Sequence, residues 1–165
     1  MLDLSEIYDA HAQALYGFLL NLTRNEADSQ DALQEVFARI ARKPGCLTEV
    51  RDLRAFLFRM AHHASVDQTR NRASRTRTAE RAALEPTELF APSTDPDADF
   101  FRKRVAEALQ ELPEEQRAVV HLKIWEDLTF VEIARVLDIP ANTAASRYRY
   151  AIEKLGSHLR PLLHP

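Results

Sequence analysis

Apolar residues recur at helical spacing through the first part of the chain. Residues 4–22 carry one broad apolar stripe, formed by Leu4, Ile7, Tyr8, Ala12, Leu15, Phe18, Leu19 and Leu22. Residues 26–42 repeat the i, i+3, i+4, i+7 spacing with Leu33, Val36, Phe37 and Ile40, and Pro44 with Gly45 ends that segment. A third stripe in residues 53–72 predicts burial of Leu53, Phe56, Leu57, Met60, Ala64 and Val66. The pattern predicts three amphipathic helices within residues 1–75.

The apolar periodicity stops after residue 75. Residues 76–99 contain three prolines and many Ser, Thr and Asp residues, and a helical turn is predicted only around residues 79–84. A coil of about 25 residues spans on the order of 28 Å, which lets two small domains move independently. We therefore predict a flexible linker over residues 76–99.

Helical periodicity returns in residues 100–165. A helix through residues 100–112 is broken by Pro113, which sits near the first turn of the next helix. Thr129 and Glu132 have the spacing of a capping box at the start of a short helix, and a turn through Asp138 and Pro140 leads into a longer last helix. Short helix, tight turn and longer helix form a helix-turn-helix. The predicted fold is all-α, with helical domains at 1–75 and 100–165 and a C-terminal helix-turn-helix.

Composition narrows the classes of protein to consider. The 165-residue chain has a single cysteine, Cys46, which excludes an intramolecular disulfide framework and a multi-cysteine zinc site. The first residues carry acids where a signal peptide carries bases, and no apolar run reaches membrane-spanning length. The sequence predicts a cytoplasmic protein without membrane insertion.

Charge is strongly segregated along the chain. Residues 1–38 hold one base and seven acids, whereas residues 39–81 hold eleven bases and four acids. Residues 82–132 hold five bases and twelve acids, and residues 133–165 hold five bases and two acids. Two basic blocks at separate places favour a polyanion held at two points over simple surface variety.

The motifs of common enzymes are absent from the sequence. It contains no Gly-rich phosphate loop, no H-E-x-x-H and no G-x-S-x-G. His62 and His63 are adjacent, so on a helix they point about 100° apart and make a poor metal pair. Asp28, Asp31 and Glu35 share a helix face, which favours a solvated or partner-binding surface over a carboxylate site. We predict no enzymatic activity, no metal and no cofactor.

The last helix has two distinct faces. At 100° per residue, one side is formed by Ala144, Tyr148, Ala151 and Leu155, which predicts a buried seam. The opposite side would enter the major groove of DNA, where Arg149 suits guanine and Asn142 suits adenine, while Arg147 and Lys154 suit phosphates. The alternative is an ordinary solvated face. The capped helix and turn that precede it favour DNA recognition.

Four motifs in order resemble the sigma-70 family of bacterial RNA polymerase sigma factors. They are D-x-x-Q-E-V-F at 31–37, the pair Asp67 and Arg70, L-P-x-x-x-R at 112–117 and L-T-x-x-E-I-A at 128–134. Two such domains with a short linker resemble the extracytoplasmic-function (ECF) class, and the likeness covers roughly residues 5–160. It implies a transcription initiation factor that binds core RNA polymerase, directs it to promoters and aids melting of the −10 element.

The resemblance implies three groups of site residues. The core-polymerase group is Asp31, Gln34, Glu35 and Phe37. The −10 DNA group is Arg59, His63, Asp67, Arg70, Arg72 and Arg75, assisted by the loop at residues 43–52, which would hold an unstacked base. The −35 DNA group is Asn142, Thr143, Ser146, Arg147, Arg149, Tyr150 and Lys154. Other members of the family commonly have basic residues at the positions of Ala145, Tyr150 and Glu153. Because this chain lacks those positive charges, we expect its affinity for −35 DNA alone to be modest.

Two other functions fit parts of the sequence. A helix-turn-helix regulator that does not engage polymerase would need no acidic face at 31–37, and a sigma-like decoy would fit the thinned basic face of the last helix. Many members of the family are held inactive by an anti-sigma factor. The resemblance therefore implies three kinds of partner: core RNA polymerase, promoter DNA and an anti-sigma factor.

Overall fold

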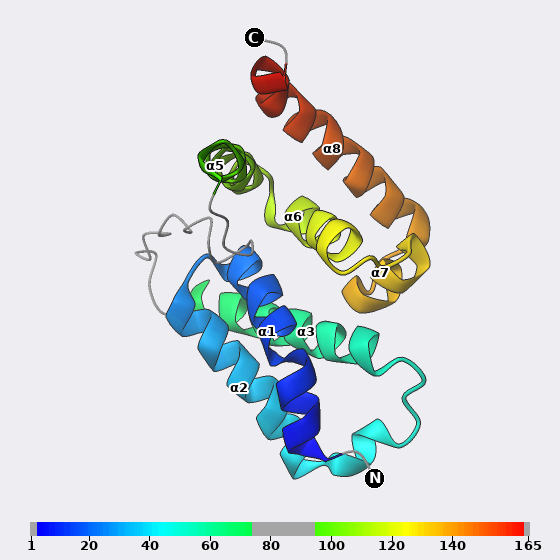
Figure 1. Ribbon diagram of the computed structural model, residues 1–165. Coiled ribbons are helices and arrows are strands. Elements are labelled where there is room, and N and C mark those ends of the chain that lie inside the picture. Colours follow the sequence, from blue (N-terminus) through cyan, green and yellow to red (C-terminus); the bar gives the residue numbers. More distant parts are fainter. Residues whose placement is uncertain (1–2, 74–94, 164–165) are drawn as a thin grey trace. The chain divides into compact units, whose positions relative to one another are not determined.

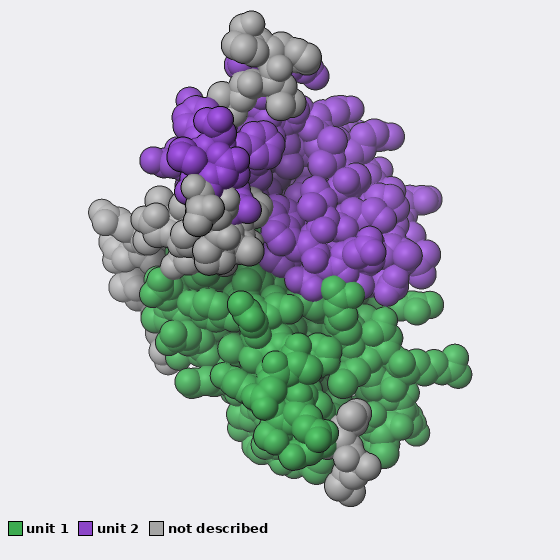
Figure 2. Space-filling view, in the orientation of Figure 1, with its two compact units in different colours: residues 1–82, 135–138 green, residues 83–134, 139–165 purple. Residues whose placement is uncertain are grey.

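The computed structural model describes residues 3–73 and 95–163, with side chains described through residue 71 in the first range and residue 161 in the second (Figure 1). All regular secondary structure in these ranges is helical, which confirms the predicted all-α class. The chain divides into two compact units, one of residues 1–82 and 135–138 and one of residues 83–134 and 139–165 (Figure 2). The predicted turn around residues 79–84 lies outside the described residues.

The first unit is built on three helices, α1 (Leu4–Thr23), α2 (Glu26–Arg42) and α3 (Leu53–Ala73), with a short 3-10 turn η1 (Pro44–Leu47) after α2. Each of the three helices contacts the other two. Local signals set their ends, because Asp3 accepts a hydrogen bond from the Ser5 amide at 3.2 Å and Asn25 accepts one from the Asp28 amide at 3.0 Å. Arg24 adopts a left-handed conformation that ends α1.

The core of the first unit confirms the predicted stripe of α2 and corrects that of α3. Leu33, Val36, Phe37 and Ile40 are all buried, as predicted. On α3 the buried residues are Leu57, Phe58, Ala61, Ala64 and Ser65, whereas Leu53, Phe56, Met60 and Val66 are only partly buried. Phe58 meets Phe18 of α1 edge to face, with ring centroids 5.3 Å apart. On α1, Tyr8 is 48% exposed, although the stripe predicted its burial.

The second unit contains α5 (Pro96–Gln110), α6 (Glu114–Val120), the π-helical turn η2 (His121–Trp125), residues 130–134 of α7 (Phe130–Leu137) and α8 (Ala141–Leu163). The last helix, α8, contacts both α5 and α6. The core of this unit joins Leu109, Leu112 and Val120 to Ala151 and Leu155 of α8. The π-helical turn was not predicted from the sequence.

The first helix of the second unit begins earlier than the sequence predicted. It starts at Pro96, not at Phe100, and Asp95 caps it by accepting a hydrogen bond from the Asp97 amide at 3.0 Å. Asp97 and Asp99 then lie in its first turn, where acids stabilise the positive end of the helix dipole. The end of the predicted linker therefore belongs to α5.

The capping box that opens the helix-turn-helix is confirmed. The Thr129 amide donates to Glu132 Oε1 at 3.1 Å, and the Glu132 amide donates to Thr129 Oγ1 at 3.2 Å. Asp138 takes a left-handed conformation with a φ of 57° after α7, and the Ile139 amide donates to the Ala134 carbonyl at 3.0 Å. This turn ends α7 and leads the chain through Pro140 into α8.

The corrected face of α3 predicts different costs for two neighbouring aromatic residues. Phe58→Ala should lower the free energy of unfolding by about 3–5 kcal/mol, because it leaves a cavity against Phe18. Phe56→Ala, the matched control on the same helix, should cost less because its side chain is only partly buried. Urea unfolding followed by circular dichroism measures both, and equal costs would contradict the assigned buried face.

Candidate nucleic-acid and partner interface

The acidic residues of α2 lie on an accessible face. Asp31 and Gln34 are exposed and Glu35 is partly exposed, so all three are available to a partner. Phe37 differs from the prediction that grouped it with them. It is 8% exposed, and its ring packs edge to face on Tyr8 with centroids 4.9 Å apart. Phe37 therefore packs the first unit and offers no exposed contact.

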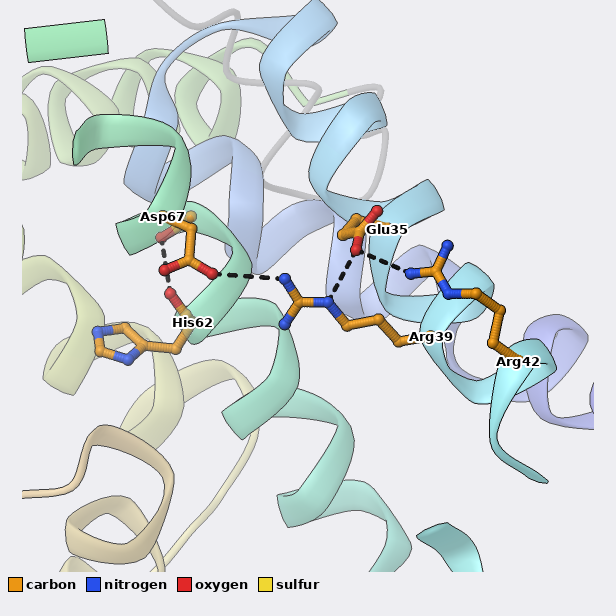
Figure 3. A network of polar contacts seen from close by, with 6 residues as sticks. Glu35, Arg39, Arg42, His62 and Asp67 are labelled. Carbon is orange, nitrogen blue, oxygen red and sulfur yellow. Dashed lines mark hydrogen bonds and ion pairs between the residues drawn. The ribbon is translucent and has the colours of Figure 1, made fainter. Parts of the chain in front are cut away.

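A network of ion pairs connects α2 to α3 (Figure 3). Glu35 Oε1 accepts hydrogen bonds from Arg39 Nε at 2.8 Å and from Arg42 Nη2 at 3.2 Å. Arg39 also donates from Nη2 to Asp67 Oδ2 of α3 at 3.4 Å. The hydrogen bond from Arg39 holds the pKa of Glu35 below its usual value, and Glu35 in turn raises the pKa of Arg39.

The network borders a groove of about 510 Å³ between α2 and α3. Its lining includes Asp31, Glu35 and Arg39 from α2 and Asp67, Arg70 and Asn71 from α3. The structure thus brings two predicted partner residues to the same groove as two predicted DNA residues. Arg39 was missed by the sequence analysis, although its i, i+4 spacing from Glu35 is the signal of an ion pair on a helix.

Besides Asp67, four of the residues predicted to bind −10 DNA lie in α3. Arg59, His63 and Arg70 are exposed. Arg72 lies in α3 but its side chain is outside the described part of the chain, and Arg75 is outside it altogether. In the loop before α3, residues 43–46 are exposed, and Asp52 caps the helix by accepting a hydrogen bond from the Ala55 amide at 3.1 Å.

The last helix separates a buried seam from an outer face, as predicted. Ala144 and Ala151 are fully buried, Leu155 is 7% exposed, and Tyr148 packs edge to face on Phe130 with ring centroids 5.5 Å apart. Of the predicted DNA residues, Asn142, Arg149, Tyr150 and Lys154 are exposed, and Thr143, Ser146 and Arg147 are partly exposed. The face that the helical wheel assigns to DNA is therefore accessible.

Two cations of α8 have partners within the chain. The Arg149 guanidinium lies over the Tyr150 ring, 5.2 Å from its centroid, which holds both side chains on the outer face. Lys154 Nζ donates to the Glu111 carbonyl at the end of α5, at 3.0 Å. An ammonium has three donors, so this bond leaves Lys154 able to contact a phosphate as well.

Other features of the described residues bear on chemistry. Within residues 3–73 and 95–163, no group of three or more His, Cys, Asp or Glu side chains is placed to hold a metal ion. No helix in the same ranges is long and apolar enough to cross a membrane. His62, on α3, has a buried Nδ1 without a hydrogen-bond partner among these residues. Burial lowers the pKa of His62 from 6.5 to about 4, with a smaller effect from His63.

Comparison with known proteins finds two family models along the chain. Residues 7–75 match the model described as Sigma-70 region 2. Residues 102–155 match the model described as Sigma-70, region 4. The first match contains the groove between α2 and α3, and the second contains the helix-turn-helix.

Curated relatives and solved structures are similar over nearly the whole chain. The ECF RNA polymerase sigma factor SigL of Mycobacterium tuberculosis (strain ATCC 25618 / H37Rv) is 30% identical over 157 residues, covering 94% of this chain and 88% of SigL. SigK of Mycobacterium bovis (strain BCG / Pasteur 1173P2) is 29% identical over 162 residues, covering 94% of this chain and 84% of SigK.

Two solved structures share the fold. RpoE, crystallised with the anti-sigma factor NepR from Bartonella quintana, has a TM-score of 0.76 at 18% identity and covers 94% of this chain and 96% of its own. CnrH, in complex with the cytosolic domain of CnrY, has a TM-score of 0.65 at 22% identity and covers 96% of this chain and 88% of its own.

The lowered pKa of His62 predicts a pH-dependent stability. An unfolded histidine has a pKa near 6.5, so below that pH the unfolded chain binds a proton that the folded chain does not. This contribution to stability is complete above pH 6.5 and is lost as the pH falls to about 4. His62→Gln should flatten the pH dependence of unfolding in this window by up to one proton.

The exposed neighbour provides the control for this measurement. His63→Gln should keep most of the wild-type dependence when urea unfolding is measured at several pH values between 4 and 7, because burial is the larger cause of the lowered His62 pKa. A wild-type slope in His62→Gln would show that the buried imidazole is not its source.

Proposed function

We propose a mechanism for this chain from the premise that it belongs to the ECF class of the sigma-70 family. It is a transcription initiation factor, and in our proposal its first unit binds core RNA polymerase and the −10 element while its second unit binds the −35 element. The observation that carries this proposal is the accessible polar face of α8, which directly follows the capped helix α7 and its turn.

In the proposed complex, α2 contacts the polymerase. Asp31, Gln34 and Glu35 are accessible on one helix face, and two of them are carboxylates suited to a basic surface. On the resemblance to the family, we assign this contact to the clamp helices of the large polymerase subunit. Glu35 would exchange its bonds with Arg39 and Arg42 for bonds to the partner, so contact there replaces one set of cations with another.

The −10 element is assigned to α3 and to the loop that precedes it. Arg59 and Arg70 are exposed cations that suit phosphates, and His63 is exposed on the same helix. The loop at residues 43–52 contains no aromatic side chain, so an unstacked base held there would rest on polar and aliphatic contacts.

The −35 element is assigned to the outer face of α8. Arg149 is exposed, and its bidentate guanidinium suits the O6 and N7 atoms of guanine. Asn142, at the start of the same helix, suits adenine, while Arg147 and Lys154 suit the flanking phosphates. Because phosphate contacts carry no sequence information directly, we expect most of the sequence discrimination to come from Arg149 and Asn142.

Regulation by an anti-sigma factor is part of the proposal. The structures of RpoE and CnrH that share this fold are complexes, in which NepR is named as an anti-sigma factor and the cytosolic domain of CnrY is the partner. The second unit of this chain exposes apolar side chains that would suit such a partner, including Ile124 at 52% and Val131 at 54% exposure.

Transcription from genomic DNA tests the function directly. Core polymerase is incubated with and without the protein, and the RNA 5′ ends are sequenced. New start sites that share upstream −35 and −10 elements are expected. Core binding in a pull-down without new starts would favour a decoy, and neither core binding nor new starts would favour a regulator that acts without polymerase.

The assignment of Arg149 predicts a base-specific defect. Arg149→Ala should weaken transcription from promoters with guanine at one −35 position by roughly 5- to 150-fold and relax selectivity there, because a bidentate contact is worth about 1–3 kcal/mol. Arg160→Ala removes the same charge further along α8 and should change promoter strength by less than about twofold. A uniform loss across all −35 sequences in Arg149→Ala would identify a phosphate contact instead.

A further inference from the structure

Arg39 is the one residue of the described network that contacts carboxylates on both α2 and α3. Its Nε donates to Glu35 at 2.8 Å on its own helix, and its Nη2 donates to Asp67 at 3.4 Å on α3 (Figure 3). We propose that Arg39 is a positioning residue that couples polymerase binding through α2 to promoter opening through α3. This inference rests on the proposed function, which assigns α2 to polymerase and α3 to the −10 element.

The α2 end of this connection lies within the predicted polymerase contact. Glu35 accepts hydrogen bonds from two guanidinium groups, those of Arg39 and Arg42, and its side chain is 42% exposed. A basic partner that bonds to Glu35 competes with Arg39 for the same oxygen atom. Engagement of Glu35 therefore changes the bonds available to Arg39, and with them its hold on Asp67.

The α3 end gives Asp67 a role that its charge supports. A carboxylate on a helix that faces DNA repels the phosphates. A direct contact of Asp67 with the DNA backbone would therefore oppose DNA binding. As the acceptor for Arg39, Asp67 instead fixes α3 relative to α2. The bond from Gln68 Nε2 to the Asp28 carbonyl, at 3.1 Å, ties the next residue of α3 to α2 as well. The predicted −10 residue Asp67 thus acts through Arg39.

The expected size of the stability effect separates positioning from simple bracing. All three side chains of the pairs are more than 40% exposed, at 41% for Arg39, 42% for Glu35 and 53% for Asp67. Exposed pairs of this kind change an unfolding equilibrium by less than about fivefold. A positioning role predicts a larger effect on promoter opening than on folding, whereas simple bracing predicts losses that follow stability.

Arg42 provides a matched control. It lies on the same helix, has the same charge and donates to the same oxygen of Glu35 at 3.2 Å. Among the described residues, the structure records no contact between Arg42 and Asp67. Replacing either arginine frees Glu35 of one guanidinium, but only the change at Arg39 removes the connection to α3.

The test measures promoter opening with the full chain and saturating core polymerase. Wild type, Arg39→Ala, Arg42→Ala, Asp67→Ala and the Arg39→Ala/Asp67→Ala double variant are compared by permanganate reactivity of −10 thymines. Opening by Arg39→Ala should fall at least about fivefold below that of Arg42→Ala, within the usual range of coupling between two sites. Asp67→Ala should show a similar loss, and the double variant should be no worse than the poorer single variant.

A parallel cycle in the free protein measures the connection without polymerase. Urea unfolding of the same four sequences in the Arg39 and Asp67 cycle should give a coupling between about 1.5-fold and 5-fold in the equilibrium constant. Additive unfolding effects would overturn the inference whatever happens in transcription.

The remaining outcomes divide the inference from the proposed function. An active wild type with equal opening by Arg39→Ala and Arg42→Ala would overturn the inference alone. A changed base preference in Asp67→Ala would also overturn it, because Asp67 would then read a base directly. A wild type that neither binds core nor opens any promoter would overturn the proposed function together with the coupling that depends on it.

Discussion

The edge-to-face contact of Phe18 with Phe58 is the interaction on which the first unit depends. It joins the C-terminal half of α1 to the N-terminal half of α3, and α2 packs on both helices with its own stripe of Leu33, Val36 and Ile40. When these side chains are buried, the apolar face of each helix lies in the core and its polar face is exposed to solvent. The groove between α2 and α3 follows from that division, since its charged lining cannot enter the core.

In the second unit, local hydrogen bonds and a tight turn determine where the helices lie. The reciprocal bonds between Thr129 and Glu132 fix where α7 begins, and the left-handed Asp138 fixes where it ends. The direction of α8 is set by this turn and by the small residues Ala144 and Ala151, which are fully buried in the seam. Stacking of His121 on Trp125, with ring centroids 5.4 Å apart, fills the π-helical turn before α7.

The buried faces predicted from the sequence were correct for the helices whose apolar and polar residues fall on separate sides. The stripe of α2 and the seam of α8 were correct because charged residues leave only one face for burial. The stripe of α3 was partly wrong because Phe56, Leu57 and Phe58 follow one another, and periodicity cannot choose among neighbours that are all apolar. The start of α5 was missed although Asp95 followed by Pro96 is a local capping signal. The bond from Arg39 to Asp67 spans 28 positions, so only the tertiary packing of α2 against α3 reveals it.

The division of α8 into a buried seam and an outer face has a consequence for how such proteins diverge. The side chains that hold α8 in place, such as Ala151 and Leu155, are separate from those that face outward, such as Asn142 and Arg149. Surface substitutions away from special contacts usually change stability by less than about 0.5 kcal/mol. Under the proposed −35 role of the outer face, a duplicated copy of this gene can therefore change its target promoters through outward-facing substitutions that leave the buried seam, and with it the fold, intact.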